Sequence, residues 1–247
     1  MPCFNGIFSH FLSSPTVSTC KIVSTHHLAK DQKGNTIMPT EDGKLTVGIL
    51  LFEDAEVLDF CGPFEVFSVT GRLKATGKNQ GGTDTAINVY HIAQSERPVK
   101  ALGNFLVQPH YTIQNHPELD VLVVPGGWGV WAAVQQEEVV AWVRRMAGRV
   151  TVMSSVCTGA FLLGQAGLLA GRKATTHWMS LERLSREFPQ TEVQTGVRWV
   201  DEGDLVTSAG IEAGIDMSLH LVERLLGREM AETTAKRMEY SWQENQP

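Results

Sequence analysis

Three short, largely apolar runs constrain the fold of this chain more than any other feature of its sequence. They span residues 45–52 (LTVGILLF), 120–125 (DVLVVP) and 151–155 (TVMSS). Runs of this length without polar alternation are typical of strands buried on both faces of a parallel sheet. Segments with helical spacing lie between them. This alternation predicts an α/β fold in which helices cover both faces of a mainly parallel sheet.

The remaining segments extend this pattern. Pro63 suits the first turn of a helix, so we expect a helix to begin close to it. Residues 70–85 are rich in Gly, Lys and Asn and predict an exposed loop, and residues 86–93 predict a strand that leads into a hairpin. Further helices are expected over 137–149, 159–169, 178–188, 210–226 and up to 240, and short strands over 173–176, 197–200 and 205–207.

The first 43 residues differ from the rest in composition. They are rich in Ser and Thr, contain no Arg, and carry no acidic residue before Asp31. A signal or transit peptide would usually carry a cationic segment or Arg, so we favour a disordered extension, and Met38 is an alternative start. We expect residues 44–247 to form a single domain.

Composition and charge exclude several function classes. The chain has 247 residues and a net charge of -6, and its Lys and Arg residues form no long runs. Nucleic acid is therefore not the expected partner, because phosphate binding needs clustered positive charge. No apolar stretch approaches the roughly 18 residues of a membrane span. The four cysteines show neither C-x-x-C nor a metal-ligand spacing, which favours a reducing cytoplasm and no metal site.

Cys157 stands where the third apolar run turns into a predicted helix. The small residues Thr158, Gly159 and Ala160 follow it and permit the tight, strained turn of a nucleophile elbow. The positive end of the helix and nearby backbone N–H groups favour a thiolate, which predicts a lowered thiol pKa. We therefore interpret Cys157 as a nucleophile, with a buried structural cysteine as the alternative.

Two other strand ends meet Cys157 at the carboxyl edge of the predicted sheet. Asp59 follows the first strand, and Gly126 and Gly127 follow the second. A carboxylate beside a thiolate tends to share a proton with it, so Asp59 is a candidate acid or base, with a helix N-cap as its alternative role. The N–H groups of Gly127 and Thr158 could stabilise negative charge on a substrate.

Three further residues have more than one interpretation. His177 ends a short predicted strand at the same edge, and is either a base or a wall residue of the pocket. Glu212 and Asp216 fit the stabilisation of a helix start better than chemistry.

Five pieces of sequence carry a family resemblance. They are LDFCGPFEV at 58–66, VPGGWG at 124–129, SVCTGAFLLGQAGLLAG at 155–171, ATTHW at 174–178 and GIEAGID at 210–216. Together they resemble the ThiJ/PfpI superfamily, the cysteine-bearing relatives of class I glutamine amidotransferases, and within it the isonitrile hydratases. The resemblance implies a flavodoxin-like three-layer sandwich, a homodimer, a small-molecule substrate, and a reaction that needs no metal or organic cofactor.

The resemblance also implies roles for individual residues. Cys157 would attack an isonitrile carbon, Asp59 would protonate the intermediate, and Thr158 would assist. Water would then release an N-substituted formamide, the reaction of a hydro-lyase. The chain departs from the hydratase pattern at Cys61, where those enzymes have Thr, and at Trp128, where they have a smaller residue.

These departures leave the substrate open. We expect Cys61 and Trp128 to border the pocket, together with Gly126 and His177, and the region 71–100 is longer than the pattern predicts.

Other activities in the superfamily provide the alternatives. Its proteases carry His directly after the nucleophile, where this chain has Thr158, so peptidase activity is disfavoured. A glyoxalase or deglycase needs little more than an activated Cys and an acid. Related domains also form the sensor half of AraC-type regulators, which continue into a DNA-binding domain of roughly 100 residues. This chain ends at Pro247 and keeps both Cys157 and Asp59, so we favour an enzyme over a sensor.

Overall fold

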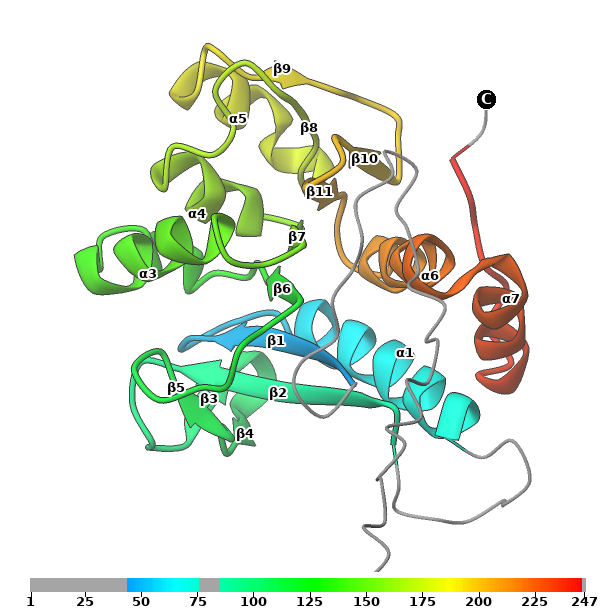
Figure 1. The fold of residues 1–247 in the computed structure, drawn as a ribbon. Coiled ribbons are helices and arrows are strands. Elements are labelled where there is room, and N and C mark those ends of the chain that lie inside the picture. Colours follow the sequence, from blue (N-terminus) through cyan, green and yellow to red (C-terminus); the bar gives the residue numbers. More distant parts are fainter. Residues whose placement is uncertain (1–43, 76–84, 246–247) are drawn as a thin grey trace, which may run out of the picture.

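The computed structural model describes residues 44–75 and 85–245 (Figure 1). The predicted N-terminal extension and residues 76–84 of the predicted loop lie outside the described residues. Within them, a seven-stranded sheet has the order β10-β11-β7-β6-β1-β2-β5. All neighbouring strands run parallel except β10 and β11, which are antiparallel. The strands are β1 (Leu45–Leu51), β2 (Ile87–Ala93), β5 (Tyr111–Thr112), β6 (Val121–Val124), β7 (Val152–Val156), β10 (Trp199–Asp201) and β11 (Leu205–Ser208).

The three predicted apolar runs form the centre of this sheet. Every residue of β1, β6 and β7 is buried, as expected for strands covered on both faces. In the pairing register, Val47 lies opposite Val121, and Val121 opposite Val152. The predicted α/β class with a mainly parallel sheet is therefore confirmed.

Helices form the two outer layers (Figure 1). On one face, α1 (Val57–Ala75), α6 (Ala213–Leu226) and α7 (Arg228–Arg237) pack against one another. The other face carries α2 (Val130–Ala133), α3 (Glu137–Ala147) and α4 (Gly159–Gln165). After α4 the chain makes an excursion through β8 (Lys173–Ala174), η2 (Trp178–Ser180), α5 (Leu181–Glu187) and β9 (Glu192–Val193).

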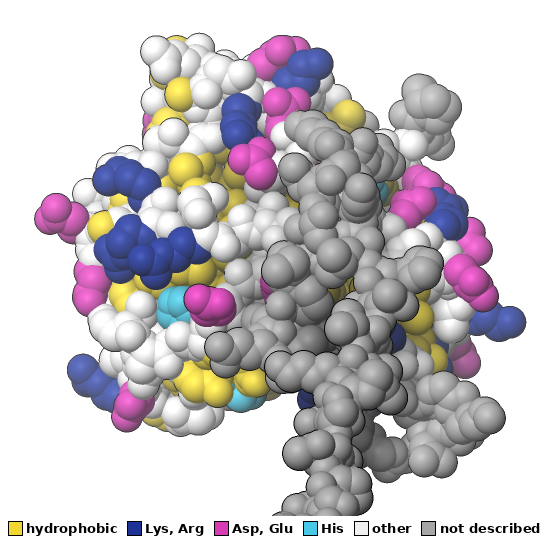
Figure 2. All heavy atoms as spheres, viewed as in Figure 1, with side chains coloured by type: hydrophobic (Ala, Val, Ile, Leu, Met, Phe, Trp, Pro, Cys, Tyr) yellow, Lys and Arg dark blue, Asp and Glu magenta, His cyan; other side chains and the backbone are white. Residues whose placement is uncertain are grey.

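The amphipathic spacing of α3 shows why this layer forms. Its buried side chains recur at helical spacing from Val139 through Trp142 and Val143 to Met146, so one stripe faces the sheet. Arg144 and Arg145 lie on its exposed side. Figure 2 shows basic side chains gathered over this part of the molecule.

The first helix differs from its predicted course. It begins at Val57, so Pro63 lies inside it rather than in the first turn. It also continues through Ala75, into residues predicted to be a loop. Tertiary contact explains this extension, because Thr70 is fully buried and its hydroxyl lies 3.0 Å from that of Thr234 on α7. Packing against α7 therefore outweighs the local loop signal.

Several smaller boundaries also shift. The predicted hairpin is present as β3 (Val99–Ala101) and β4 (Phe105–Val107), joined by η1 (Leu102–Asn104). The sequence did not predict β5 or β9, which have two residues each. The long helix α6 begins at Ala213, three residues later than expected. Among the described residues, no helix is long and apolar enough to span a membrane.

Candidate active site

Cys157 occupies a strained turn between β7 and α4. Its φ is +57°, in the left-handed region that non-glycine residues rarely adopt. The Cys157 N–H donates to the carbonyl oxygens of Ser208 (3.2 Å) and Ala209 (3.3 Å), and the Thr176 hydroxyl donates to its carbonyl oxygen at 2.7 Å. Hydrogen bonds to neighbouring segments therefore hold the strained backbone in place.

Two glycines allow close packing around the thiol. A Cβ at Gly210 would stand 2.8 Å from Cys157 Sγ and 2.6 Å from His177 Cδ2. A Cβ at Gly126 would stand 2.5 Å from the Thr158 nitrogen and 3.0 Å from Asp59 Oδ2. Both positions need glycine because backbone and side-chain atoms of the site occupy the space that a Cβ would take.

Asp59 lies in the first turn of α1 and is fully buried. Its Oδ2 accepts the Gly126 N–H at 2.9 Å, so the carboxylate bonds to the loop after β6 rather than to the amides of its own helix. Its Oδ1 is buried and has no hydrogen-bond partner of normal geometry among the described residues. A buried carboxylate oxygen without a donor is a costly arrangement, and such groups cluster at functional sites.

Burial raises the pKa of Asp59 to about 7. The Gly126 N–H opposes this rise, the charge of Glu56 adds to it, and a weaker interaction with the Cys157 thiol lowers the pKa. The carboxyl group therefore exchanges its proton close to neutral pH, in the range where general acids and bases are most effective.

The pKa of the Cys157 thiol is raised rather than lowered. Burial and the charge of Asp59 raise it to about 12, although the N–H and hydroxyl of Thr158 lower it. The predicted low thiol pKa is therefore wrong for this arrangement. The local effect of a helix start is outweighed by desolvation and by the neighbouring carboxylate. At neutral pH the thiol therefore keeps its proton, and Asp59 is the group of the two that changes its protonation state.

The predicted backbone donors already have partners. The Gly127 N–H donates to the Thr158 hydroxyl at 3.0 Å. The Thr158 N–H and hydroxyl both interact with the Cys157 sulfur. A substrate oxyanion or carbanion would therefore reach the Gly127 N–H only after the Thr158 side chain rotates.

A pocket of about 440 Å³ opens above Cys157. Its lining residues are Glu56, Gly127, Trp128, Trp131, Cys157, Thr158, His177, Met179, Ser180, Arg183 and Ile211. Trp128 and His177 therefore lie in its wall, as the sequence predicted. Gly126 lies behind the wall, against Thr158 and Asp59, and half-buried Cys61 packs against the core from α1. Neither of these two residues lines the pocket.

His177 acts as a cap in this arrangement. Its Nδ1 accepts the Met179 N–H at 3.4 Å at the start of η2, and its ring lies against Gly210. Among the residues described, no group of three or more His, Cys, Asp and Glu side chains could hold a metal ion.

The sequence did not predict that Arg183 and Trp131 line the pocket. The Arg183 guanidinium lies 3.6 Å above the centre of the Trp131 ring, and its Nε donates to Glu187 at 2.6 Å. Arg183 and Glu187 are spaced for a helical ion pair, but nothing in the sequence indicates that α5 places Arg183 in the lining of the Cys157 pocket.

Comparison with known protein families finds one that matches most of the chain. The model of the DJ-1/PfpI family matches residues 45–224. The chain belongs to the DJ-1/PfpI family. This confirms the resemblance to ThiJ/PfpI proteins that the sequence motifs indicated.

Relatives within the DJ-1/PfpI family have different activities. The isonitrile hydratase of Pseudomonas putida is 32% identical over 80% of this chain and 79% of its own. The transcriptional regulator GbdR of Pseudomonas aeruginosa is 27% identical over 79% of this chain, which spans half of the regulator. A ThiJ/PfpI family protein from Pseudomonas syringae has a similar crystal structure, with a TM-score of 0.70 and 30% identity over 81% of this chain and 76% of its own.

Proposed function

We propose that this protein is a cysteine-dependent enzyme that hydrates an isonitrile to an N-substituted formamide. The observation that carries the proposal is Cys157 in the lining of a pocket of about 440 Å³, with the buried carboxyl group of Asp59 beside its thiol. The similarity to an isonitrile hydratase over most of both chains supports this reaction. We also propose that residues 44–247 form one domain, which works as a homodimer in the cytoplasm without a metal or organic cofactor.

The pocket suits a small substrate with an apolar body. Trp128, Trp131, Met179 and Ile211 are large apolar residues in its lining. Trp128 and Met179 are largely exposed, at 76% and 71%, so the mouth of the pocket is open and apolar. An alkyl or cycloalkyl isonitrile could place its substituent against this surface and its terminal carbon near Cys157 Sγ.

The reaction begins with movement of one proton within the pair. The thiol gives its proton to Asp59, and the thiolate forms a bond to the terminal isonitrile carbon. One pair of C–N π electrons moves onto the nitrogen, and the lone pair that the carbon keeps takes the proton from Asp59, which gives an S-linked thioimidate. Asp59 suits this exchange because its pKa is raised to about 7.

Water completes the cycle. It adds to the thioimidate carbon, one of its protons moves to the nitrogen through Asp59, and the C–S bond breaks. The products are an N-substituted formamide and the thiolate, which recovers its proton. The net reaction adds one water to one isonitrile. The Thr158 N–H stabilises the thiolate when it forms and when it leaves, since it already contacts the sulfur.

A sensor of small molecules is the second candidate. It is favoured by the similarity to the regulator GbdR and by the high pKa of the resting thiol, which would suit binding without reaction. A glyoxalase or deglycase would use the same cysteine and carboxylate with a carbonyl substrate.

The test incubates the full chain with cyclohexyl isocyanide and measures formamide by gas chromatography. We expect turnover by the wild type, and a loss of roughly 10²- to 10⁴-fold in Cys157→Ala and Asp59→Asn. Cys61→Ser is the matched control, because this thiol lies outside the pocket wall, and it should retain the wild-type rate.

Three results would contradict the proposal. If the folded wild type binds the isocyanide without forming formamide, the sensor is supported instead. If it converts methylglyoxal but not the isocyanide, the glyoxalase is supported. If Asp59→Asn keeps full activity, the carboxyl group is not the acid.

A further inference from the structure

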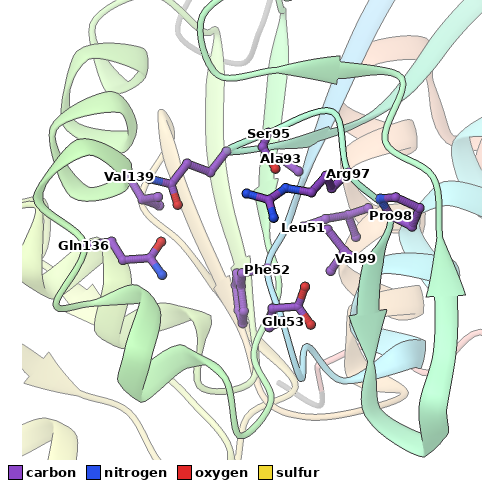
Figure 3. Close-up of a pocket in the computed structure, with 11 residues that line it drawn as sticks. Leu51, Phe52, Glu53, Ala93, Ser95, Arg97, Pro98, Val99, Gln136 and Val139 are labelled. Atoms are coloured by element: carbon purple, nitrogen blue, oxygen red, sulfur yellow. The ribbon is translucent and has the colours of Figure 1, made fainter.

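A second cavity of about 410 Å³ lies at the carboxyl ends of β1 and β2, beside the start of α3 (Figure 3). Its lining residues are Leu51, Phe52, Glu53, Ala93, Gln94, Ser95, Arg97, Pro98, Val99, Gln136 and Val139. None of these residues lines the Cys157 pocket. The carboxyl edge of a parallel sheet is where ligands of α/β proteins commonly bind.

One basic and one acidic side chain, those of Arg97 and Glu53, line this cavity together with apolar residues. Leu51, Phe52 and Val139 are buried and supply the floor. The Arg97 side chain extends toward the middle of the lining residues, with its guanidinium at the centre of the group in Figure 3. Among residues 44–75 and 85–245, no ion pair includes Arg97 or Glu53.

The hydrogen-bonding groups of the cavity also have spare capacity. One oxygen of Glu53 accepts the Lys100 N–H at 3.3 Å, which leaves the other oxygen for a ligand. The Gln136 side chain points inward in Figure 3, where its amide can both donate and accept. The cavity therefore offers a cation, an anion and an amide around one apolar surface.

We infer that this cavity binds a small zwitterion with an apolar side chain, such as an aliphatic α-amino acid. Arg97 would hold the carboxylate, Glu53 the ammonium group, and Phe52 and Val139 the side chain. A simple anion would be repelled by Glu53 and a simple cation by Arg97. A ligand that carries both charges is attracted by both groups.

The cavity shares a backbone segment with the Cys157 pocket. Phe52 and Glu53 line the cavity, and Glu56, three residues later, lines the pocket. The Glu56 N–H donates to the Gly126 carbonyl at 2.9 Å, and the Gly129 N–H donates to the Asp54 carbonyl at 3.1 Å. A ligand in the cavity therefore contacts the segment that also holds the loop after β6.

Isothermal titration of the full chain with L-leucine tests the inference. Isovalerate, which lacks the ammonium group, and 3-methylbutylamine, which lacks the carboxylate, are titrated in parallel. We expect saturable binding of leucine at millimolar concentration or below, and affinities at least about tenfold weaker for both analogues.

Variants locate the ligand. Arg97→Gln and Glu53→Gln should each weaken leucine binding roughly tenfold. Arg149→Gln is the matched control, because Arg149 is exposed beyond the far end of α3, and it should bind as the wild type does. Cys157→Ala should also bind leucine unchanged.

The inference is overturned if folded wild type shows no leucine binding at millimolar concentration. It is also overturned if Arg97→Gln binds as tightly as the wild type, or if isovalerate binds as tightly as leucine. Loss of binding in Cys157→Ala would place the ligand in the other pocket and overturn it equally. Because these measurements need no turnover, their outcome is independent of the proposed isonitrile chemistry.

Discussion

Two aspartates of this protein occupy equivalent positions in two different helices but have different partners. Asp59 lies in the first turn of α1 and Asp216 in the first turn of α6, and both are fully buried. Asp216 is ion-paired with Arg198, whose Nε donates to it at 2.6 Å, and its other oxygen accepts the Gln243 N–H at 2.9 Å. Asp59 accepts a single backbone N–H, from Gly126, among the described residues.

Under the proposed function, this difference separates a structural carboxylate from a reactive one. Burial raises the pKa of both groups, but at Asp216 the Gln243 N–H and the Arg198 charge oppose the rise. Asp216 thereby links α6 to the residue just before β10 and to the segment that follows α7. Among the residues that the structure describes, Asp59 has no cation to compensate its charge, and it lies beside a thiol instead. Burial alone therefore does not mark a reactive carboxylate, whereas burial without compensation does.

The largest expected effect comes from removing the uncompensated charge. The folded-state pKa of Asp59 is about 7, above its unfolded value of 3.8. Below pH 3.8 the carboxyl group is protonated in both the folded and the unfolded state, so burying it costs no charge desolvation. Above pH 7 it is ionised in both states, and the folded state bears the full cost of burying the charge. Asp59→Asn should therefore stabilise the protein increasingly between pH 4 and pH 7, by up to something on the order of 4 kcal/mol.

Urea unfolding of wild type and variant at several pH values measures this gain. Asp216→Asn is the matched comparison, since Arg198 and the Gln243 N–H offset the cost of burying this charge, and it should gain much less stability than Asp59→Asn between pH 4 and pH 7. If Asp59→Asn is destabilising at pH 8, the two carboxylates do not differ as the structure indicates.

The next largest effect on stability is expected for Arg198, the cation that compensates the charge of Asp216. Arg198→Ala leaves the Asp216 charge buried without its cation, and we expect the free energy of unfolding to fall by about 3 kcal/mol. This is the lower end of the range for buried pairs, because the Arg198 side chain is 28% exposed. Arg186→Ala is the control, since Arg186 is exposed on α5. Equal unfolding midpoints for both variants would show that Asp216 does not need its cation.

The sequence predicted the central strands and the meeting of Asp59, Gly126 and Cys157 at one edge. Such predictions succeed because buried strands need continuous apolar residues, and parallel strands end on the same side. The failures come from interactions across the fold. Pro63 gave a local helix-start signal, yet the helix begins at Val57. Cys157 followed a local rule for low pKa, yet burial and Asp59 reverse its direction.

Other features had no local signal at all. The stacking of Arg183 on Trp131 depends on how α5 returns to the site, and the second cavity depends on Arg97 and Glu53 being brought together from different strand ends. Both are consequences of chain topology, which residue spacing does not encode.

The smallest expected effect tests whether Asp59 and Cys157 share a proton, through the alkylation of Cys157 by iodoacetamide. If they share one, the reactive species above pH 7 is the form in which Asp59 holds the proton and the sulfur is a thiolate. The population of that form is independent of pH once the pair has a single negative charge. The wild-type rate should therefore level off above the Asp59 pKa of about 7.

In Asp59→Asn the thiol ionises alone, so its rate should continue to rise tenfold per pH unit. The variant should react about as fast as the wild type at pH 6 and about tenfold faster at pH 8. Mass spectrometry of the peptide that contains Cys157 separates this thiol from the other cysteines, and Asp216→Asn should keep the wild-type profile. Parallel profiles for wild type and Asp59→Asn through pH 8 would mean that the two groups ionise independently. The carboxylate without a cation would then be, like Asp216, a structural group, and the acid of the proposed hydration would have to be sought elsewhere in the pocket.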